Sequence, residues 1–148
     1  MAISMACPYF YPLERLGLAD VWPHPDRLPL GDGFAGACRA DPGAEFHPTP
    51  EMLRDCCNLG YARGHCPRFV RNGSPDAIRF TISADDQRMI RVDYAYEQNH
   101  RPGCCGSLEY DRQAAVFRSP PEDAILLRQV ETYIESYRRR KLEIAIQP

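Results

Sequence analysis

The chain has 148 residues, of which 44% are hydrophobic and 26% charged, a composition typical of one globular domain with a modest core. A formal net charge of −2 is not that of a general nucleic-acid binder, and no apolar run approaches the ~20 residues that a membrane-spanning helix needs. Residues 1–18 contain no basic leader followed by a long apolar core, so we expect no secretory signal and a cytoplasmic protein.

Residues 1–48 are rich in residues that interrupt regular structure. Seven prolines and five glycines fall here, so the sequence predicts neither long helices nor central strands. A short helical turn is expected around Leu13–Leu18. The small-residue segment Gly31–Ala40 predicts a backbone that passes close to another group, with Cys38 as the side chain that arrives there. Because so long an irregular segment is unusual in a compact domain, we expect a bound metal cofactor to order it.

Residues 49–67 predict a short helix followed by a loop. Thr49 can cap the helix, and Pro50 fits the first helical position, where no amide donor is needed. Asn58 and Gly60 can both take the left-handed conformation that ends a helix. Two cysteines stand at this end and a third lies in the loop, so the stretch is expected to hold half of a metal site.

Alternation of apolar and polar residues after a turn signal at 71–75 predicts an antiparallel sheet. Strands over 78–83 and 90–97 should pair as a hairpin through residues 85–87. After a loop over 98–106, a third strand should start at Leu108 and run towards Phe117. One sheet face would be apolar. The other carries charges of both signs, which we interpret as a solvated face: Arg79, Arg91, Asp93, Glu97, Glu109 and Asp111.

A C-terminal helix is predicted from about Pro121 to about Leu142, capped by Ser119 and carrying an apolar stripe that covers the sheet. The basic run at 138–141 would complement the negative end of this helix. The tail at 143–148 is expected to add an edge strand or to pack on a partner. The predicted fold is therefore a single α+β domain over 1–148. A loop-rich cysteine lobe (1–72) precedes an antiparallel three- to four-stranded sheet covered by the C-terminal helix (73–148).

Seven cysteines in a chain without an export signal favour metal ligation or redox chemistry over disulfides. Cys7, Cys38, Cys57 and Cys66 are separated by 30, 18 and 8 residues, and proline follows the first and the last of them. Such dispersed cysteines suit an iron–sulfur cluster better than zinc, which usually takes close C-x₂-C pairs. We predict that these four residues hold a [4Fe–4S] cluster rather than a [2Fe–2S] cluster, with zinc as the alternative. Adjacent helical side chains diverge by about 100°, so Cys57 is favoured and Cys56 is the alternative ligand.

For most of the remaining candidate residues we favour a structural or solvent-exposed role over a ligand or redox role. Cys104 and Cys105 lie between glycines, and a packed or exposed thiol pair is favoured over a redox pair or spare ligands. His65 is expected to face solvent or to hydrogen-bond a sulfur rather than to ligate a metal. His100 could lower the pKa of a nearby thiol and make it a nucleophile. Two or three of the seven cysteines are expected to be small buried hydrophobes.

The function predicted from these residues is electron transfer or redox sensing by a small iron–sulfur protein with a redox partner protein, and with no nucleic acid or membrane as partner. Two alternatives stay open. One is an enzyme whose cluster keeps an open iron position as a Lewis acid, with His65 or a thiol carrying protons. The other is a structural zinc module that binds another protein. No phosphate-binding loop, nucleophile elbow or H-E-x-x-H motif assigns a catalytic residue.

Overall fold

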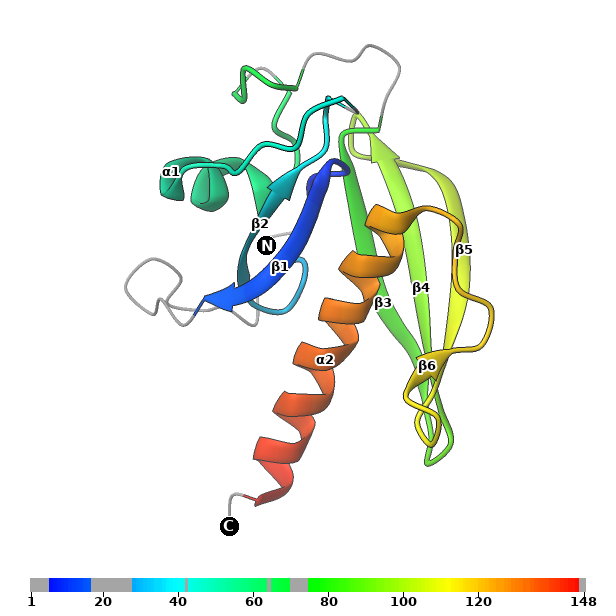
Figure 1. Cartoon of the computed structure of the whole chain (residues 1–148). Helices are drawn as coiled ribbons and strands as arrows, with labels where there is room; N and C mark the ends of the chain where they lie inside the picture. The colour runs from blue at the N-terminus through cyan, green and yellow to red at the C-terminus, as the bar shows by residue number, and fades with distance from the viewer. Residues whose placement is uncertain (1–5, 17–27, 42, 64, 70–74, 147–148) are drawn as a thin grey trace.

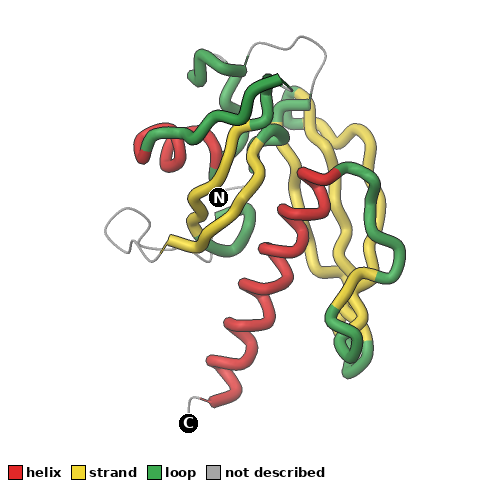
Figure 2. The backbone as a smooth tube through the Cα atoms, viewed as in Figure 1, coloured by secondary structure: helices red, strands yellow, loops and turns green. Residues whose placement is uncertain are grey.

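The structure is a computed structural model that describes residues 6–16, 28–41, 43–63, 65–69 and 75–146, with side chains to 142. Within these ranges the chain has the α+β fold that the sequence predicted, with a four-stranded antiparallel sheet and a long C-terminal helix, and it has a second, two-stranded antiparallel sheet (Figures 1 and 2). The elements, in chain order, are β1 (Phe10–Leu16), β2 (Gly33–Cys38), α1 (Pro50–Met52), the π-helical turn η2 (Leu53–Cys57), β3 (Ala77–Asp85), β4 (Met89–Gln98), β5 (Arg101–Asp111), β6 (Val116–Phe117) and α2 (Ala124–Ile146).

The N-terminal half contains a backbone ladder that the sequence did not predict. β1 and β2 pair antiparallel from Phe10 opposite Cys38 to Leu16 opposite Gly33, so the helical turn expected from Leu13 is wrong as far as Leu16; residues 17 and 18 lie outside the described part. The pairing tolerates a proline because the register shifts just after Pro12. Gly36 approaches β1 so closely that a Cβ there would lie 2.1 Å from the Tyr11 carbonyl oxygen. The close approach expected of this segment is therefore confirmed, and its neighbour is the chain itself.

The larger sheet has the order β3-β4-β5-β6. The β3–β4 hairpin is confirmed, with Phe80 opposite Tyr94 and Ile82 opposite Val92. Of the loop expected over 98–106 only Asn99 and His100 lie outside the strands, because a tight turn with positive φ at these two residues joins β4 directly to β5. The third strand also does not continue to Phe117. It ends at Asp111, and β6 folds back on it. The turn signal at 71–75 lies mostly outside the described residues.

Helix α2 covers the apolar face of this sheet, as predicted, through Leu126, Val130 and Ile134 in the core (Figure 1). It begins three residues later than expected, because Asp123 rather than Ser119 accepts the first backbone bonds, from Ile125 and Leu126. It also runs to Ile146, so the expected edge strand in the tail is wrong for residues 143–146. Figure 2 shows the helix running between the β1–β2 pair and the four-stranded sheet.

The basic run on α2 does not sit at the helix end, so its predicted role as a dipole complement is wrong. The four side chains instead bind groups on other elements. Arg139 and Arg140 pair with the buried carboxylate of Asp32, and Lys141 pairs with Asp85 at the end of β3. Arg138 donates to the Tyr110 hydroxyl at 2.9 Å. These charges fix the helix to both halves of the chain.

The two halves share one hydrophobic core, although the sequence suggested a cysteine lobe draped beside a sheet. Ala6 forms an isolated antiparallel bridge with Ile78, which ties the N-terminal segment to β3. The other sheet face carries ion pairs within and between strands, such as Arg91 with Asp93 on β4 and Arg118 with Glu109 of β5, each at 3.5 Å. Glu97 is an exception: a register shift after Ala95 turns it inward, and it is only 3% exposed. Among the described residues, no helix is long and apolar enough to cross a membrane.

Candidate metal centre

Five of the seven cysteines meet at one apolar cavity, which we call the thiol cavity. Its lining residues are Cys7, Tyr9, Phe10, Cys38, Ala40, Pro48, Met52, Cys56, Cys57, Ala62, Cys66, Arg68 and Phe69. Four of the cysteines are buried and Cys66 is partly exposed, and all seven in the chain are free thiols. The fold therefore brings together every cysteine predicted from the sequence to be a ligand, from four separate segments.

Backbone bonds hold the two upstream cysteines at the cavity. Cys7 donates its N–H to the Cys57 carbonyl at 3.3 Å. Its own carbonyl accepts a 2.8 Å bond from Gln129 of α2, which also donates to Phe10 at 2.7 Å. Cys38, the last residue of β2, exchanges both backbone bonds with Phe46, at 2.6 and 3.2 Å. These bonds connect the thiols to the sheet and to the helix.

The helix α1–η2 presents two adjacent thiols. The Thr49 hydroxyl caps it by accepting from Met52 at 3.3 Å with Pro50 at the first position, as predicted. The last turn is π-helical, with a bond from the Asn58 N–H to the Leu53 carbonyl, five residues back. In this turn Cys56 and Cys57 both line the thiol cavity, although adjacent helical side chains were expected to diverge. Which one is a ligand stays a prediction.

The end of this helix differs in one respect from the expectation. Asn58 keeps a right-handed conformation at φ −88°, and Gly60 takes the left-handed one at φ +73°. Asn58 is fully buried, accepts from the Phe34 N–H at 3.0 Å and donates to the Phe34 carbonyl at 3.0 Å. Its side chain therefore pairs with β2 as a neighbouring strand would, and fixes the cysteine helix against that strand.

Tyr61 ties the following loop, which carries Cys66, to the large sheet. Its backbone N–H donates to the Asp76 backbone carbonyl at 3.0 Å, and its hydroxyl donates to the buried carboxylate of Glu97 at 2.7 Å. Its ring stacks on the His100 ring, with 4.2 Å between the ring centroids. Burial and the Glu97 carboxylate raise the pKa of Tyr61 to about 12. His100 is thus placed as a stacking partner of Tyr61, beside the cysteine loop.

Burial in the thiol cavity disfavours the ionised form of three of its cysteines. Burial raises the pKa of Cys7 to about 12, with the neighbouring thiols adding to the effect. Burial, followed by the thiols of Cys7 and Cys38, raises the pKa of Cys57 still further. The pKa of Cys56 is raised by burial and by the adjacent Cys66. Only a strong positive charge at this place would let several of these thiols ionise together, as metal ligation requires.

The thiol cavity is narrow. Of about 330 Å³ of space between its atoms, about 10 Å³ can take water-sized molecules, close to the minimum for a single water. Within the described part of the chain, no three His, Cys, Asp or Glu side chains are grouped to hold a single metal ion. The thiols therefore surround a small dry volume and do not converge on a point.

The other sequence candidates lie elsewhere. Cys104 and Cys105 are exposed on β5 and line two different cavities on opposite sides of the strand. They lie on a strand, not in the loop expected for them, and neither lines the thiol cavity. His65 is exposed, and its N–H donates to Ala62 at 2.9 Å.

Three residues around the thiol cavity were missed by the sequence reasoning: Asn58 as a buried crosslink, Gln129 as the support of Cys7, and Arg68 in the cavity wall. The polar position within an apolar helical stripe was a usable signal for Gln129. Asn58 was read only as a helix stop, because its position after Cys57 suits that role equally well. Arg68 follows Cys66-Pro67 and has no pattern that separates it from the many surface arginines.

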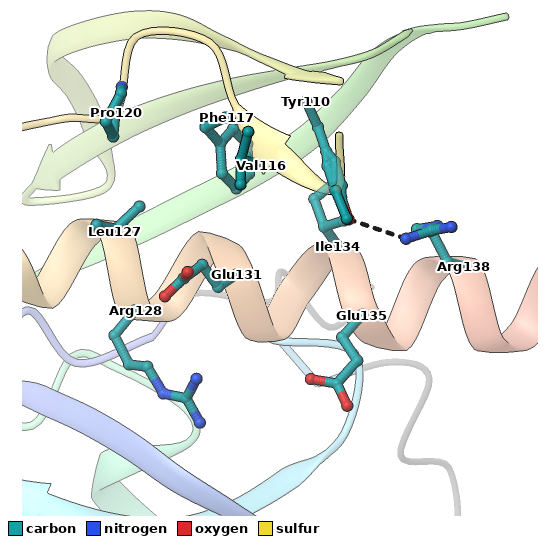
Figure 3. Close-up of a pocket in the computed structure, with 11 residues that line it drawn as sticks. Tyr110, Val116, Phe117, Pro120, Leu127, Arg128, Glu131, Ile134, Glu135 and Arg138 are labelled. Atoms are coloured by element: carbon teal, nitrogen blue, oxygen red, sulfur yellow. Dashed lines mark hydrogen bonds between the residues drawn. The ribbon is translucent and has the colours of Figure 1, made fainter. Parts of the chain in front are cut away.

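A second cavity, of about 500 Å³, lies between α2 and the β5–β6 hairpin (Figure 3). Figure 3 shows Tyr110 and Phe117 on one wall, with Glu131 and Glu135 projecting from the helix, and Arg138 bonded to the Tyr110 hydroxyl. The described lining contains no cysteine or histidine.

Comparisons of the chain with protein-family models, curated proteins and solved structures find no match.

Proposed function

We propose that the chain is a small iron–sulfur protein that holds a [4Fe–4S] cluster for electron transfer or redox sensing. The observation that carries the proposal is the meeting of five cysteines, from the segment before β1, the end of β2, the helix α1–η2 and the loop after it, at one apolar cavity. Buried cysteines are common as small hydrophobes, but hydrophobic packing alone gives no reason for so many of them to share one cavity.

A cluster is proposed over a single ion because the cysteines come from four separate segments without a close C-x₂-C pair. Only about 10 Å³ of the thiol cavity is free, so its walls would have to move apart to admit the cluster. Cys7, Cys38, Cys57 and Cys66 are proposed as the ligands, with Cys56 as the alternative to Cys57. When bound, the cluster supplies one-electron chemistry. The chain's own residues provide the rest: Phe10, Phe69 and the other apolar side chains exclude water, and this burial tunes the potential.

Cys66 is the one partly exposed thiol of the five, and it marks the side from which a redox partner protein would approach. We propose a reducing compartment such as the cytoplasm for this function, since thiolate ligands need reducing conditions.

The test is purification of the protein without oxygen, followed by iron, acid-labile sulfide and zinc analysis. The expected protein is brown, with iron and sulfide in equal amounts. Single serine substitutions at Cys7, Cys38, Cys57 and Cys66 should each lower the iron content, and serine at Cys104 serves as the matched control. A colourless protein carrying one tightly bound zinc would contradict the proposal and favour the structural zinc module.

The choice between the two adjacent cysteines has its own comparison. If Cys57 is the ligand, Cys57→Ser should lose iron whereas Cys56→Ser should retain it. Equal loss in both variants would show that the helix end, and not one thiol, is what the cluster requires.

A further inference from the structure

Arg68 places a cation in the wall of the thiol cavity. It follows Cys66-Pro67, and its guanidinium stacks over the Phe46 ring at 4.0 Å from the centroid. Its Nε is buried and has no hydrogen-bond partner in the described part of the chain. Of the described residues that line this cavity, Arg68 alone carries a formal charge at neutral pH.

Two other arginines of the N-terminal half form ion pairs with carboxylates, which Arg68 does not do within the described part of the chain. Arg39 lies 3.6 Å from Glu45, and Arg63 lies 2.9 Å from Asp76. No carboxylate among the described residues lies within ion-pair distance of Arg68. Arg68 as a whole is half-buried, but its Nε–H is a buried donor without an acceptor among the described residues. Such a donor costs stability and is uncommon in folded proteins, so an acceptor at the cavity is expected when the protein works.

Thiolates at the cavity would supply that acceptor. Ligation converts several of the neutral thiols into anions in a dry place, where charge is poorly screened. A guanidinium donates readily to such groups and offsets their charge. Hydrogen bonds to the sulfurs and net charge are two of the factors that set the potential of an iron–sulfur cluster.

We propose that Arg68 is a tuning residue of the metal centre: its Nε–H donates to a ligand or cluster sulfur, and its charge favours binding of the centre and its reduced form. This inference rests on the proposed iron–sulfur function. It assigns to one named residue a role in setting the potential, which the cysteine ligands alone do not fix.

The test compares wild type, Arg68→Met and Arg68→Lys after anaerobic cluster reconstitution. Methionine keeps an apolar stem over Phe46 and removes the donor and the charge. The midpoint potential of Arg68→Met should be more negative than that of wild type, and its cluster should be lost to a chelator about tenfold faster. Arg68→Lys keeps the charge without Nε and should fall between the two.

The metal-free protein gives a second readout that a merely structural role would not produce. Arg68→Met should leave the urea midpoint of the metal-free protein unchanged or raise it, because the buried donor without an acceptor is removed. Arg54→Met is the matched control: Arg54 lies on the cysteine helix, is exposed and pairs with Asp55 at 2.8 Å. It should change neither the potential nor the rate of cluster loss.

An unchanged potential and cluster lifetime in Arg68→Met would overturn the inference, as would an equal shift in Arg54→Met. If wild type takes up no cluster, the proposed function fails separately, and titration of the metal-free protein with Co²⁺ decides the role of Arg68. About tenfold weaker Co²⁺ binding by Arg68→Met would support the role, and equal affinity would overturn it. No Co²⁺ binding by wild type would overturn both proposals.

Discussion

Replacing Asn58 by alanine removes the crosslink between the cysteine helix and β2. The side chain is fully buried and bonds both backbone groups of Phe34 at 3.0 Å. The N–H and C=O of a strand residue point to the same side, so these two groups face away from β1 and lose their partner in the variant. The Leu53 carbonyl also bonds the Asn58 side chain, but it keeps the bond from the Asn58 backbone N–H.

The expected loss follows from the two groups left without a partner. Each buried, unsatisfied backbone group costs about 1–3 kcal/mol, so Asn58→Ala should lower the free energy of unfolding by about 2–6 kcal/mol. Such a loss is a large fraction of the ~5–15 kcal/mol that stabilises an ordinary domain. Water entering the space left by the side chain would move the value towards the lower end of this range.

Equilibrium urea unfolding followed by circular dichroism, in reducing buffer without metal, measures this loss. Gln98→Ala is the control, because Gln98 is an amide on the exposed surface and its removal should cost under about 0.5 kcal/mol. Asn58→Asp provides a sharper test. It keeps the acceptor for Phe34 but sets an oxygen against two carbonyls, so its penalty should ease as the pH falls towards 4 and the carboxyl regains a donor. A loss in Asn58→Ala no larger than that of the control would refute the reasoning.

Three further outcomes are expected. Gly36→Ala should destabilise the protein by about 1–3 kcal/mol or more, since its Cβ would meet the Tyr11 carbonyl, whereas Gly103→Ala, with its nearest neighbour at 3.5 Å, should be tolerated in the same unfolding assay. Burial raises the pKa of Asp85, but its bonds from Lys141, Tyr137 and Arg112 outweigh this and hold that pKa well below its usual range. The stabilisation by Asp85 should therefore be constant above about pH 5 and decline below about pH 4, and an Asp85→Asn deficit that stays constant to pH 2 would contradict this. Hydrogen exchange should show that metal removal loosens residues 58–69 more than β1 and β2, and equal changes in both would argue against the placement of the metal centre.

The parts of the fold that the sequence predicted are those governed by local patterns. Strict alternation defined the β3–β4 hairpin, and an apolar stripe defined α2 as the cover of the sheet. The boundaries were less accurate, because the competition between Asp123 and Ser119 as the cap depends on how the chain enters the helix.

The sequence-based prediction failed where the structure depends on contacts between residues that are distant in the sequence. The prolines and glycines of residues 1–48 argued against strands, yet Gly36 is what lets β2 lie against Pro12 and Tyr11. The inward turn of Glu97 depends on a one-residue register shift, which alternation alone does not reveal. The cysteine set was predicted from count and context, but the sequence offered Cys56 only as an alternative to Cys57, whereas both line the same cavity.

The shared core changes what a metal centre would contribute to stability. From the sequence, residues 1–72 appeared too poor in ladders and apolar runs to be ordered without a cofactor. In the structure, Phe10, Leu30 and Phe34 are buried. Two hydrogen bonds also join this half to α2, one from Gln129 to the Phe10 carbonyl and one from Ser136 to the Asp32 carboxylate. These contacts make no use of the thiols. A metal centre would therefore stabilise mainly the short loop that carries Cys66, and the surrounding fold would hold the other four thiols in place before the metal arrives.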